Sequence, residues 1–332
     1  MLRGSEMYYP WLSADYQQIM HGYLRGQGHH ALLLRTLPGL GLDALARALA
    51  VRLLCMQPVG EQPCGHCHSC QLMAAGNHPD FYQLEPESGK SQIGVERVRQ
   101  VCEKLYTHAQ QGGAKVIWMP DAGRLNEASA NALLKTLEEP PANTFFILGL
   151  DESASLLPTI ASRCQRWRLT VPNELQALGW MQQQPQANGF NHAQALQALR
   201  LSRGAPLAAL DLLAGNHMQR RADVLQGLLL FLQTADVPTF IAQLVKENPA
   251  ENLSWIISLL LETSALALGS QTVRINQDMQ PVMEQLLQRI DVVTLQHWLQ
   301  ALTALRHELL TSGSLNSELL LTTLWLRLSS DI

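Results

Sequence analysis

Four cysteines lie close together in the first half of the chain with the spacing C-x8-C-x2-C-x2-C, namely Cys55, Cys64, Cys67 and Cys70. Gaps of two residues allow a tight turn to direct neighbouring thiolates at one ion, and four thiolates complete a tetrahedral Zn²⁺ site. The stretch offers no evident catalytic base beside these thiols. The sequence therefore predicts a closed, structural zinc module at about residues 55–70.

Two other interpretations of these cysteines remain open. A C-x2-C-x2-C run also begins the ferredoxin type of iron–sulfur motif, although its C-x3-C-P continuation is missing here. Four unligated thiols are the second alternative, and they would be liable to oxidation. A histidine is able to replace one thiolate, although we expect all three nearby histidines at the surface: His66, His68 and His78. Cys102 and Cys164 are expected to serve packing.

A second pattern with chemical meaning is LRTLPGLGLD at residues 34–43. It has the frame of a P-loop, G-x-x-x-x-G-K-[ST], whose backbone N–H groups cradle phosphates. Leu42 stands at the lysine position, so the charge that would reach the phosphates is lost. Asp43 stands at the hydroxyl position, so a carboxylate replaces a neutral Mg²⁺ ligand and would face the phosphates. Taken alone, the turn is also compatible with an ordinary loop between a strand and a helix. The residues that would form this degenerate, non-functional loop are Pro38, Gly39, Gly41, Leu42 and Asp43.

These patterns lie on alternating strand and helix signals. Strands are expected at residues 31–36, 81–84, 114–119, 144–150 and 165–170, with helices at 42–55, 95–108 and 126–138. This alternation predicts a mainly parallel, five-stranded α/β sheet. After residue 172 the strand signals end. Short helices at 193–202 and 206–213, a linker at 214–216 and amphipathic helices such as 294–310 follow. The expected domains are an α/β domain (1–171), a small helical lid (172–213) and an all-α C-terminal domain (214–332).

Composition restricts the class of protein. The 332 residues are 47% hydrophobic and 16% charged, which is enough for extensive cores and excludes a disordered chain. The net charge of −4 lacks the basic excess of a free-standing nucleic-acid binder. No apolar run approaches the ~18 residues of a membrane span. Met1–Glu6 looks like a leader before Met7, and no signal peptide follows, so we expect a cytoplasmic chain, where disulfides are rare.

A longer motif identifies a family. The run NALLKTLEEPP at residues 131–141 precedes an apolar strand and then Ser162-Arg163-Cys164. Together they resemble the clamp-loader branch of the AAA+ ATPases, and the cysteine cluster is similar to the zinc module of bacterial clamp-loader subunits. The opening YPWL at residues 9–12 agrees with this resemblance, which covers roughly residues 1–210. For the rest of the chain it depends on helical character alone.

The resemblance also assigns the positions of a nucleotide site. The metal-binding aspartate after the third strand corresponds to Pro120 and the catalytic glutamate to Asp121. The polar sensor corresponds to Leu150 and the sensor arginine to about Leu207. Because proline cannot bind a metal ion, these replacements imply that the chain does not hydrolyse ATP. Arg163 is retained, and in this family it is the arginine finger that acts on ATP of a neighbouring subunit. For Arg163 itself, a structural ion pair or an exposed position is the alternative.

The resemblance thus implies a non-hydrolysing, stator-like subunit of the DNA polymerase III clamp loader, an accessory part of a DNA-directed DNA polymerase (nucleotidyltransferase) holoenzyme. Its implied partners are the gamma/tau motor subunits and the delta subunit, joined through the C-terminal collar helices, with the sliding clamp and primer–template DNA as indirect partners. No membrane partner is expected. An active AAA+ ATPase and a zinc-dependent nucleic-acid-binding module are the alternative functions.

Overall fold

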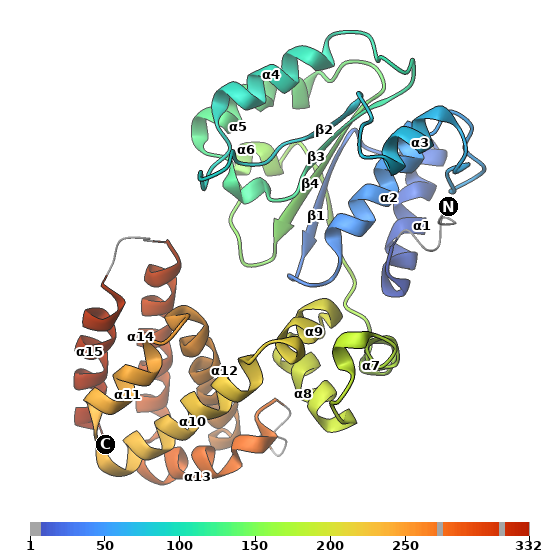
Figure 1. Cartoon of the computed structure of the whole chain (residues 1–332). Helices are drawn as coiled ribbons and strands as arrows, with labels where there is room; N and C mark the ends of the chain where they lie inside the picture. The colour runs from blue at the N-terminus through green and yellow to red at the C-terminus, as the bar shows by residue number, and fades with distance from the viewer. Residues whose placement is uncertain (1–7, 271–274, 312–315, 332) are drawn as a thin grey trace. The chain divides into compact units, whose positions relative to one another are not determined.

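A parallel five-stranded sheet forms the centre of the first half of the chain (Figure 1). Its strands are β1 (Ala31–Thr36), β2 (Phe81–Gln83), β3 (Lys115–Met119), β4 (Thr144–Asp151) and β5 (Gln165–Arg168). They pair in the order β2-β3-β4-β1-β5, and every pair is parallel. β3 is buried along its whole length, as expected for a strand covered on both faces. The computed structural model describes residues 8–270, 275–311 and 316–331, so the expected leader lies outside it.

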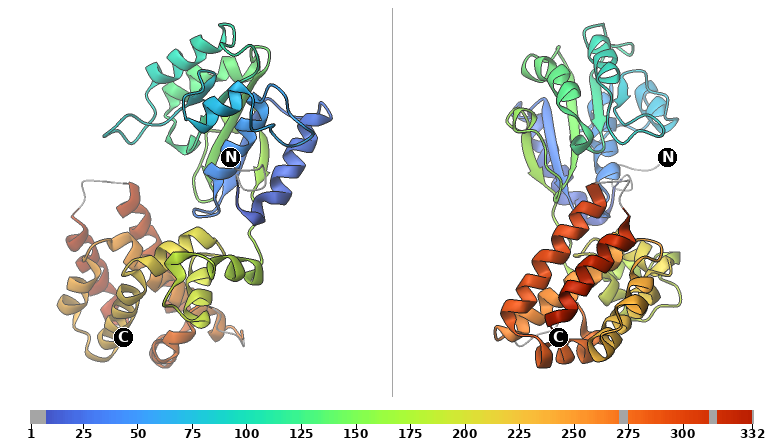
Figure 2. Two further views of the ribbon diagram at one scale, coloured as in Figure 1. Left: turned by 45° about the vertical axis from the view of Figure 1, so that its right-hand side comes forward. Right: turned by 90° about the vertical axis from the view of Figure 1, so that its left-hand side faces the viewer.

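Helices cover both faces of this sheet (Figure 1, Figure 2). Side chains of α1 (Ser13–Leu24), α2 (Leu42–Leu54) and α3 (His68–Ala74) share a core with Leu32 and Leu34 of β1. On the other face, α4 (Val95–Leu105), α5 (Glu127–Glu138) and α6 (Pro158–Ala161) pack with Leu33 of the same strand. Successive residues of a strand point to opposite faces, so β1 contributes to both cores.

The described residues form two compact units, Met1–Trp180 with Arg203–Ala208 and Met181–Ser202 with Ala209–Ile332. The second unit is helical throughout its described part, which confirms the predicted all-α character of the C-terminal region. Trp298 and Trp325 are fully buried in its core, with ring centroids 5.7 Å apart. The helices that follow the sheet are α7 (Glu174–Met181), α8 (His192–Leu201), α9 (Pro206–Ala214), α10 (His217–Thr234), α11 (Val237–Leu244), α12 (Pro249–Ala267), α13 (Gln280–Arg289), α14 (Val292–Thr311) and α15 (Ser317–Leu328).

Most expected elements are present with ends shifted by up to three residues. α4 ends at Leu105 because Lys115 donates from Nζ to the carbonyl oxygens of Leu105 and, at 2.8 Å, Thr107. β5 ends at Arg168, and the backbone N–H of Thr170 donates to the Asp15 carboxylate instead of continuing the strand. The helices α1, α3, α6 and α7 were not predicted from the sequence, and neither were the short 3₁₀ helices η2 (Pro10–Leu12), η3 (Ala122–Arg124), η4 (Pro185–Ala187), η5 (Gln277–Met279) and η6 (Ser329–Asp331). None of the described helices combines the length and apolarity needed to cross a bilayer.

Candidate functional site

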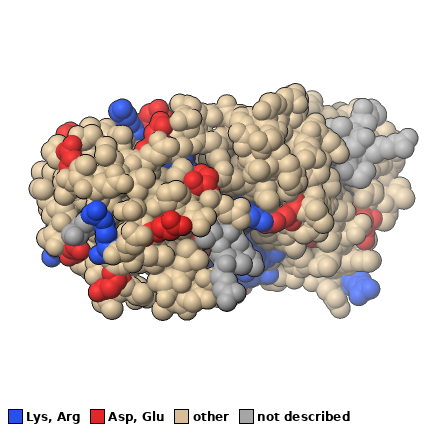
Figure 3. Space-filling model, turned by 90° about the horizontal axis from the view of Figure 1, so that it is seen from below, with Lys and Arg blue, Asp and Glu red and all other residues tan. Residues whose placement is uncertain are grey.

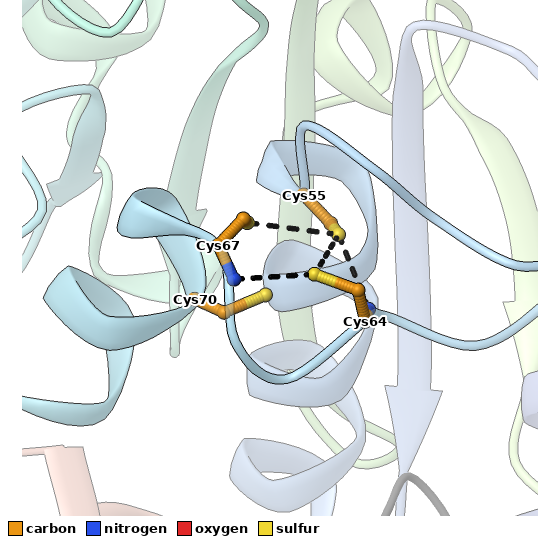
Figure 4. Close-up of side chains that lie close together, drawn as sticks. All are labelled: Cys55, Cys64, Cys67 and Cys70. Carbon is orange, nitrogen blue, oxygen red and sulfur yellow. Dashed lines mark hydrogen bonds between the residues drawn. The ribbon is translucent and has the colours of Figure 1, made fainter.

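The four cysteines converge on one point between α2 and α3 (Figure 4). Their Sγ atoms all lie within 4.8 Å of one another, and Cys55 Sγ is 3.5 Å from Cys64 Sγ and 3.9 Å from Cys67 Sγ. Four sulfur atoms at ~2.3 Å from a central zinc ion would be separated by about 3.8 Å in a tetrahedron. The arrangement therefore fits a single tetrahedral metal ion.

The surroundings favour the thiolate of Cys64 but oppose ionisation of Cys55 and Cys70. The backbone N–H of Cys64 donates to Cys55 Sγ, and that of Cys67 donates to Cys64 Sγ, each at 3.3 Å. For Cys64, burial opposes ionisation, but N–H donors from His66 and Cys67 outweigh it and lower the pKa to about 6. Burial raises the pKa of Cys55 and, together with the neighbouring Cys67, that of Cys70. A cation would be needed to keep all four deprotonated, and sulfur ligands favour zinc or iron over hard cations.

The histidines near the cluster differ from the prediction in one case. His66 and His68 are exposed, as expected, whereas the side chain of His78 is buried. Its Nδ1 accepts a hydrogen bond from the backbone N–H of Asp80 at 3.1 Å, so this histidine belongs to the turn before β2. The prediction for His78 was wrong because a histidine among polar neighbours carries no local sign of burial.

The degenerate P-loop is a closed turn between β1 and α2. Gly39 and Gly41 have φ values of +83° and +88°, a region that favours glycine. A Cβ atom on Gly41 would lie 2.3 Å from the ring of Tyr9, and one on Gly39 would lie 2.5 Å from the backbone nitrogen of Ala208. Trp11 donates from Nε1 to the carbonyl oxygen of Leu40 at 2.9 Å. Side chains and backbone of this chain therefore occupy the space against both glycines.

The residues at the other positions of a nucleotide site also lie at the carboxyl edge of the sheet, but they lack the functional groups that such a site needs. A Cβ on Gly149 would lie 2.6 Å from Leu42 and 2.3 Å from the Pro120 carbonyl oxygen, so Leu42 packs inward beside Pro120. Leu150 is buried. Asp121 accepts from Gly123 N–H and Arg124 Nε, both at 3.0 Å, and thus caps η3. The hydrogen bonds of the Asp121 carboxylate therefore stabilise the start of η3.

Arg163 lies at the opposite edge of the sheet. β1 and β5 are parallel with Leu32 opposite Gln165, so the residues just before β5 lie near the start of β1, whereas the P-loop follows its end. Arg163 donates from Nε to Glu138 Oε1 at 2.8 Å and from Nη2 to the same oxygen, and from Nη1 to the Thr159 carbonyl oxygen at 2.8 Å. Its side chain remains 32% exposed. The finger position is therefore far along the strands from this chain's own P-loop.

Two features of the site were missed from the sequence. From the sequence, no partner was predicted for Glu138. The structure instead pairs Glu138 with Arg163, which is 25 residues away and beyond any helical spacing. Arg168 at the edge strand pairs with Glu152, and Arg203 approaches the same carboxylate at 3.7 Å. Arg166 is exposed on the same strand.

Comparison with known proteins agrees with these features. A family model described as "DNA polymerase III, delta subunit" matches residues 13–173, its C-terminal counterpart matches 215–330, and the AAA+ ATPase lid domain of "DNA polymerase III subunit delta'" matches 172–214. The chain is 47% identical to the subunit delta' of Yersinia pestis over 95% of this chain and 93% of that protein. The chain belongs to the DNA polymerase III delta' family.

A second delta' relative, from Escherichia coli, is 43% identical over 97% of this chain and 95% of its own length. The subunit gamma of Buchnera aphidicola is also similar, with 34% identity over 47% of this chain and 42% of that protein. As a member of the delta' family, the chain is an accessory subunit of the DNA polymerase III clamp loader, acts in DNA replication, and is related to gamma. These matches confirm the fold class and the place in the DNA polymerase III clamp loader that were expected from the sequence.

Proposed function

We propose that this delta' chain binds no ATP productively and supplies Arg163 to ATP held by an adjacent gamma/tau subunit. The observation that carries the proposal is the contrast between the two edges of the sheet. At the carboxyl edge, Leu42, Pro120 and Leu150 stand where the lysine, the metal-binding aspartate and the polar sensor of a working nucleotide site would be. At the amino edge, Arg163 is retained, partly exposed, where it cannot reach its own P-loop.

An arginine suits a role in trans. Its guanidinium is always charged and makes forked contacts to phosphate oxygens. In known cases such a charge accelerates hydrolysis by ~10³–10⁵, because it neutralises the phosphoryl group during transfer. A finger from a neighbour also makes hydrolysis depend on assembly. We infer that this chain thereby helps ATP-bound partners load the sliding clamp onto primer–template DNA, in a ring that includes the delta subunit.

The four cysteines fit a structural zinc ion in this proposal. Cys55 directly follows α2, Cys70 lies in α3, and Cys64 and Cys67 belong to the segment between these helices. A bound zinc ion would supply a cross-link between the two helices and no reaction step. All four ligands of the zinc ion would be cysteine sulfur atoms. His66 and His68 are exposed, and His78 accepts a hydrogen bond from the backbone N–H of Asp80 instead.

The domain limits 1–171, 172–213 and 214–332 remain part of the proposal, supported by the ranges of the three family models. We assign the last domain to assembly with the other subunits. On the face drawn in Figure 3, basic and acidic side chains are interspersed, which gives no support to the alternative of a free-standing nucleic-acid binder. Since bacterial replication takes place in the cytoplasm, we expect the protein there.

The test is a complex reconstituted with Arg163→Ala. Folding, metal content and assembly should be unchanged, because the ion pair of Arg163 is partly exposed and contributes little stability. ATP hydrolysis stimulated by clamp and primed DNA should fall in part, since other motor sites keep their own fingers, and clamp loading should be impaired. Arg163→Lys should restore little, because an ammonium group lacks the fork. Normal clamp loading by an assembled Arg163→Ala complex would refute the role in trans.

A further inference from the structure

This inference deepens the proposed role of Arg163 and depends on it. Glu138 is the last residue of α5, and its carboxylate oxygen Oε1 accepts from both Nε and Nη2 of Arg163. The remaining nitrogen, Nη1, donates to the Thr159 carbonyl oxygen at 2.8 Å and lies 3.4 Å from Ser162 Oγ. All three nitrogens of the guanidinium are thus engaged within the chain.

The carboxylate is held in place by the end of its own helix. His30, the residue before β1, forms a hydrogen bond from its Nε2 to the carbonyl oxygen of Leu137 at 2.7 Å. Nε2 is the donor in this bond, because a carbonyl oxygen can only accept. The backbone N–H of Glu139 donates to the Lys135 carbonyl oxygen at 3.0 Å and closes the last turn of α5. Glu138 therefore presents its charge from a fixed backbone position on the amino edge of the sheet.

A finger held in this way is not free to act. A forked contact to phosphate needs two N–H donors that point in the same direction, and the Nε and Nη2 pair now points at Glu138. The carboxylate also neutralises the positive charge that a phosphoryl group would use. We propose that Glu138 is a positioning residue that restrains Arg163 in the unengaged subunit, and that Arg163 must exchange this carboxylate for phosphate to stimulate hydrolysis.

The exposure of the pair makes this exchange feasible. The side chains of Arg163 and Glu138 are 32% and 49% exposed. Pairs of this kind contribute little in water, so the more highly charged phosphate of a neighbouring site is able to compete for the guanidinium. Removing the charge of Glu138 should therefore favour the engaged arginine by a small factor, about two- to fivefold.

The experiment compares variants of this chain in the reconstituted clamp loader, with ATP hydrolysis measured in the absence of clamp and DNA. Glu138→Gln keeps an acceptor oxygen and removes the charge. We expect it to raise kcat about two- to fivefold without changing the KM for ATP. Glu139→Gln is the matched control, because it removes an adjacent exposed carboxylate and should change nothing. In an Arg163→Ala background, Glu138→Gln should have no effect.

The outcomes separate this inference from the proposed function. If Arg163→Ala alone leaves stimulated hydrolysis unchanged, the finger role fails and the inference fails with it. If Arg163→Ala lowers hydrolysis but Glu138→Gln leaves kcat unchanged or reduces it, only the restraint by Glu138 is refuted. A rise that persists in the Arg163→Ala background, or that Glu139→Gln reproduces, would show that the effect does not act through Arg163 and would also refute the restraint.

Discussion

The backbone N–H of Leu207 donates a hydrogen bond to the carbonyl oxygen of Gly39 at 3.1 Å. This bond joins the start of α9 to the loop that cradles phosphates in a working P-loop protein. Trp180 also packs at this loop: its ring lies edge-on to the rings of Tyr9 and Trp11, with centroid distances of 5.5 and 5.0 Å. The loop is therefore filled by contacts within the chain.

Substitution of Gly39 should disrupt the packing of residues 206–208 against the loop between β1 and α2. In Gly39→Ala, a φ of +83° costs alanine ~1–2 kcal/mol, and the collision of its Cβ with Ala208 adds about 1–3 kcal/mol. The free energy of unfolding, measured in urea by tryptophan fluorescence, should decrease accordingly. Gly76→Ala is the control, because Gly76 has a φ of +75° with open space around the added Cβ. Equal losses in the two variants would mean that the contact with Ala208 contributes nothing.

The isolated chain should not bind MgATP with useful affinity. Lysine and metal ligands supply most of the phosphate recognition in a P-loop, and here Leu42 and Pro120 occupy their positions while Asp43 is exposed as a repelling charge. Isothermal titration calorimetry should detect no binding. Restoring the motif residues with Leu42→Lys and Asp43→Thr together should still fail, because Pro120 remains. A low-micromolar dissociation constant for the unaltered chain would contradict the proposal.

The chain should carry about one zinc ion per molecule when it is purified without added metal. Cys67→Ser should lower the metal content and destabilise the segment between α2 and α3, without altering any reaction step. Cys102→Ser is the matched control, since Cys102 lies in α4 outside the cluster and should leave the zinc content unchanged. The zinc content per chain can be measured by mass spectrometric metal analysis of the purified protein and both variants. A metal content of a few tenths or less, or a brown protein that contains iron, would exclude zinc.

The stability of the chain should decrease between pH 7.5 and pH 5.5. Burial lowers the pKa of His78 and of His30 below the ordinary value of 6.5. As the pH falls through 6.5, the unfolded chain takes up protons that the folded chain still excludes, so the free energy of unfolding declines until the folded pKa is passed. Protonation of His78 at Nδ1 would also break its bond from Asp80 N–H.

Urea unfolding at several pH values checks this expectation. His78→Asn should reduce the pH dependence, whereas His108→Asn, at an exposed position in the loop after α4, should leave it unchanged. The window lies above the range in which most carboxylates titrate, so their contribution is small. If the stability is constant from pH 7.5 to pH 5.5, burial does not hold these two histidines in the neutral form.

Much of the fold was predictable because it depends on local pattern. The apolar run at β1 and the helical spacing of α2 each depend on neighbouring residues, so both elements are present where expected. The ends of elements were less predictable, because distant groups such as Lys115 and Asp15 determine where α4 and β5 stop. α7 lies in a segment where no periodic pattern was apparent.

The sequence by itself determined which groups are present and which are absent. Gaps of two residues keep Cys64, Cys67 and Cys70 close together because the intervening turns are short, and the structure brings Cys55 to the same point. Leu42 and Pro120 lack the charge and the metal ligand of a nucleotide site wherever they lie. Only the tertiary structure decided what Arg163 contacts and which way it is directed. Its partner Glu138 is 25 residues away, and the two meet because parallel strands bring the residues that precede them to a common edge of the sheet. No local spacing encodes that contact, since it depends on strand order.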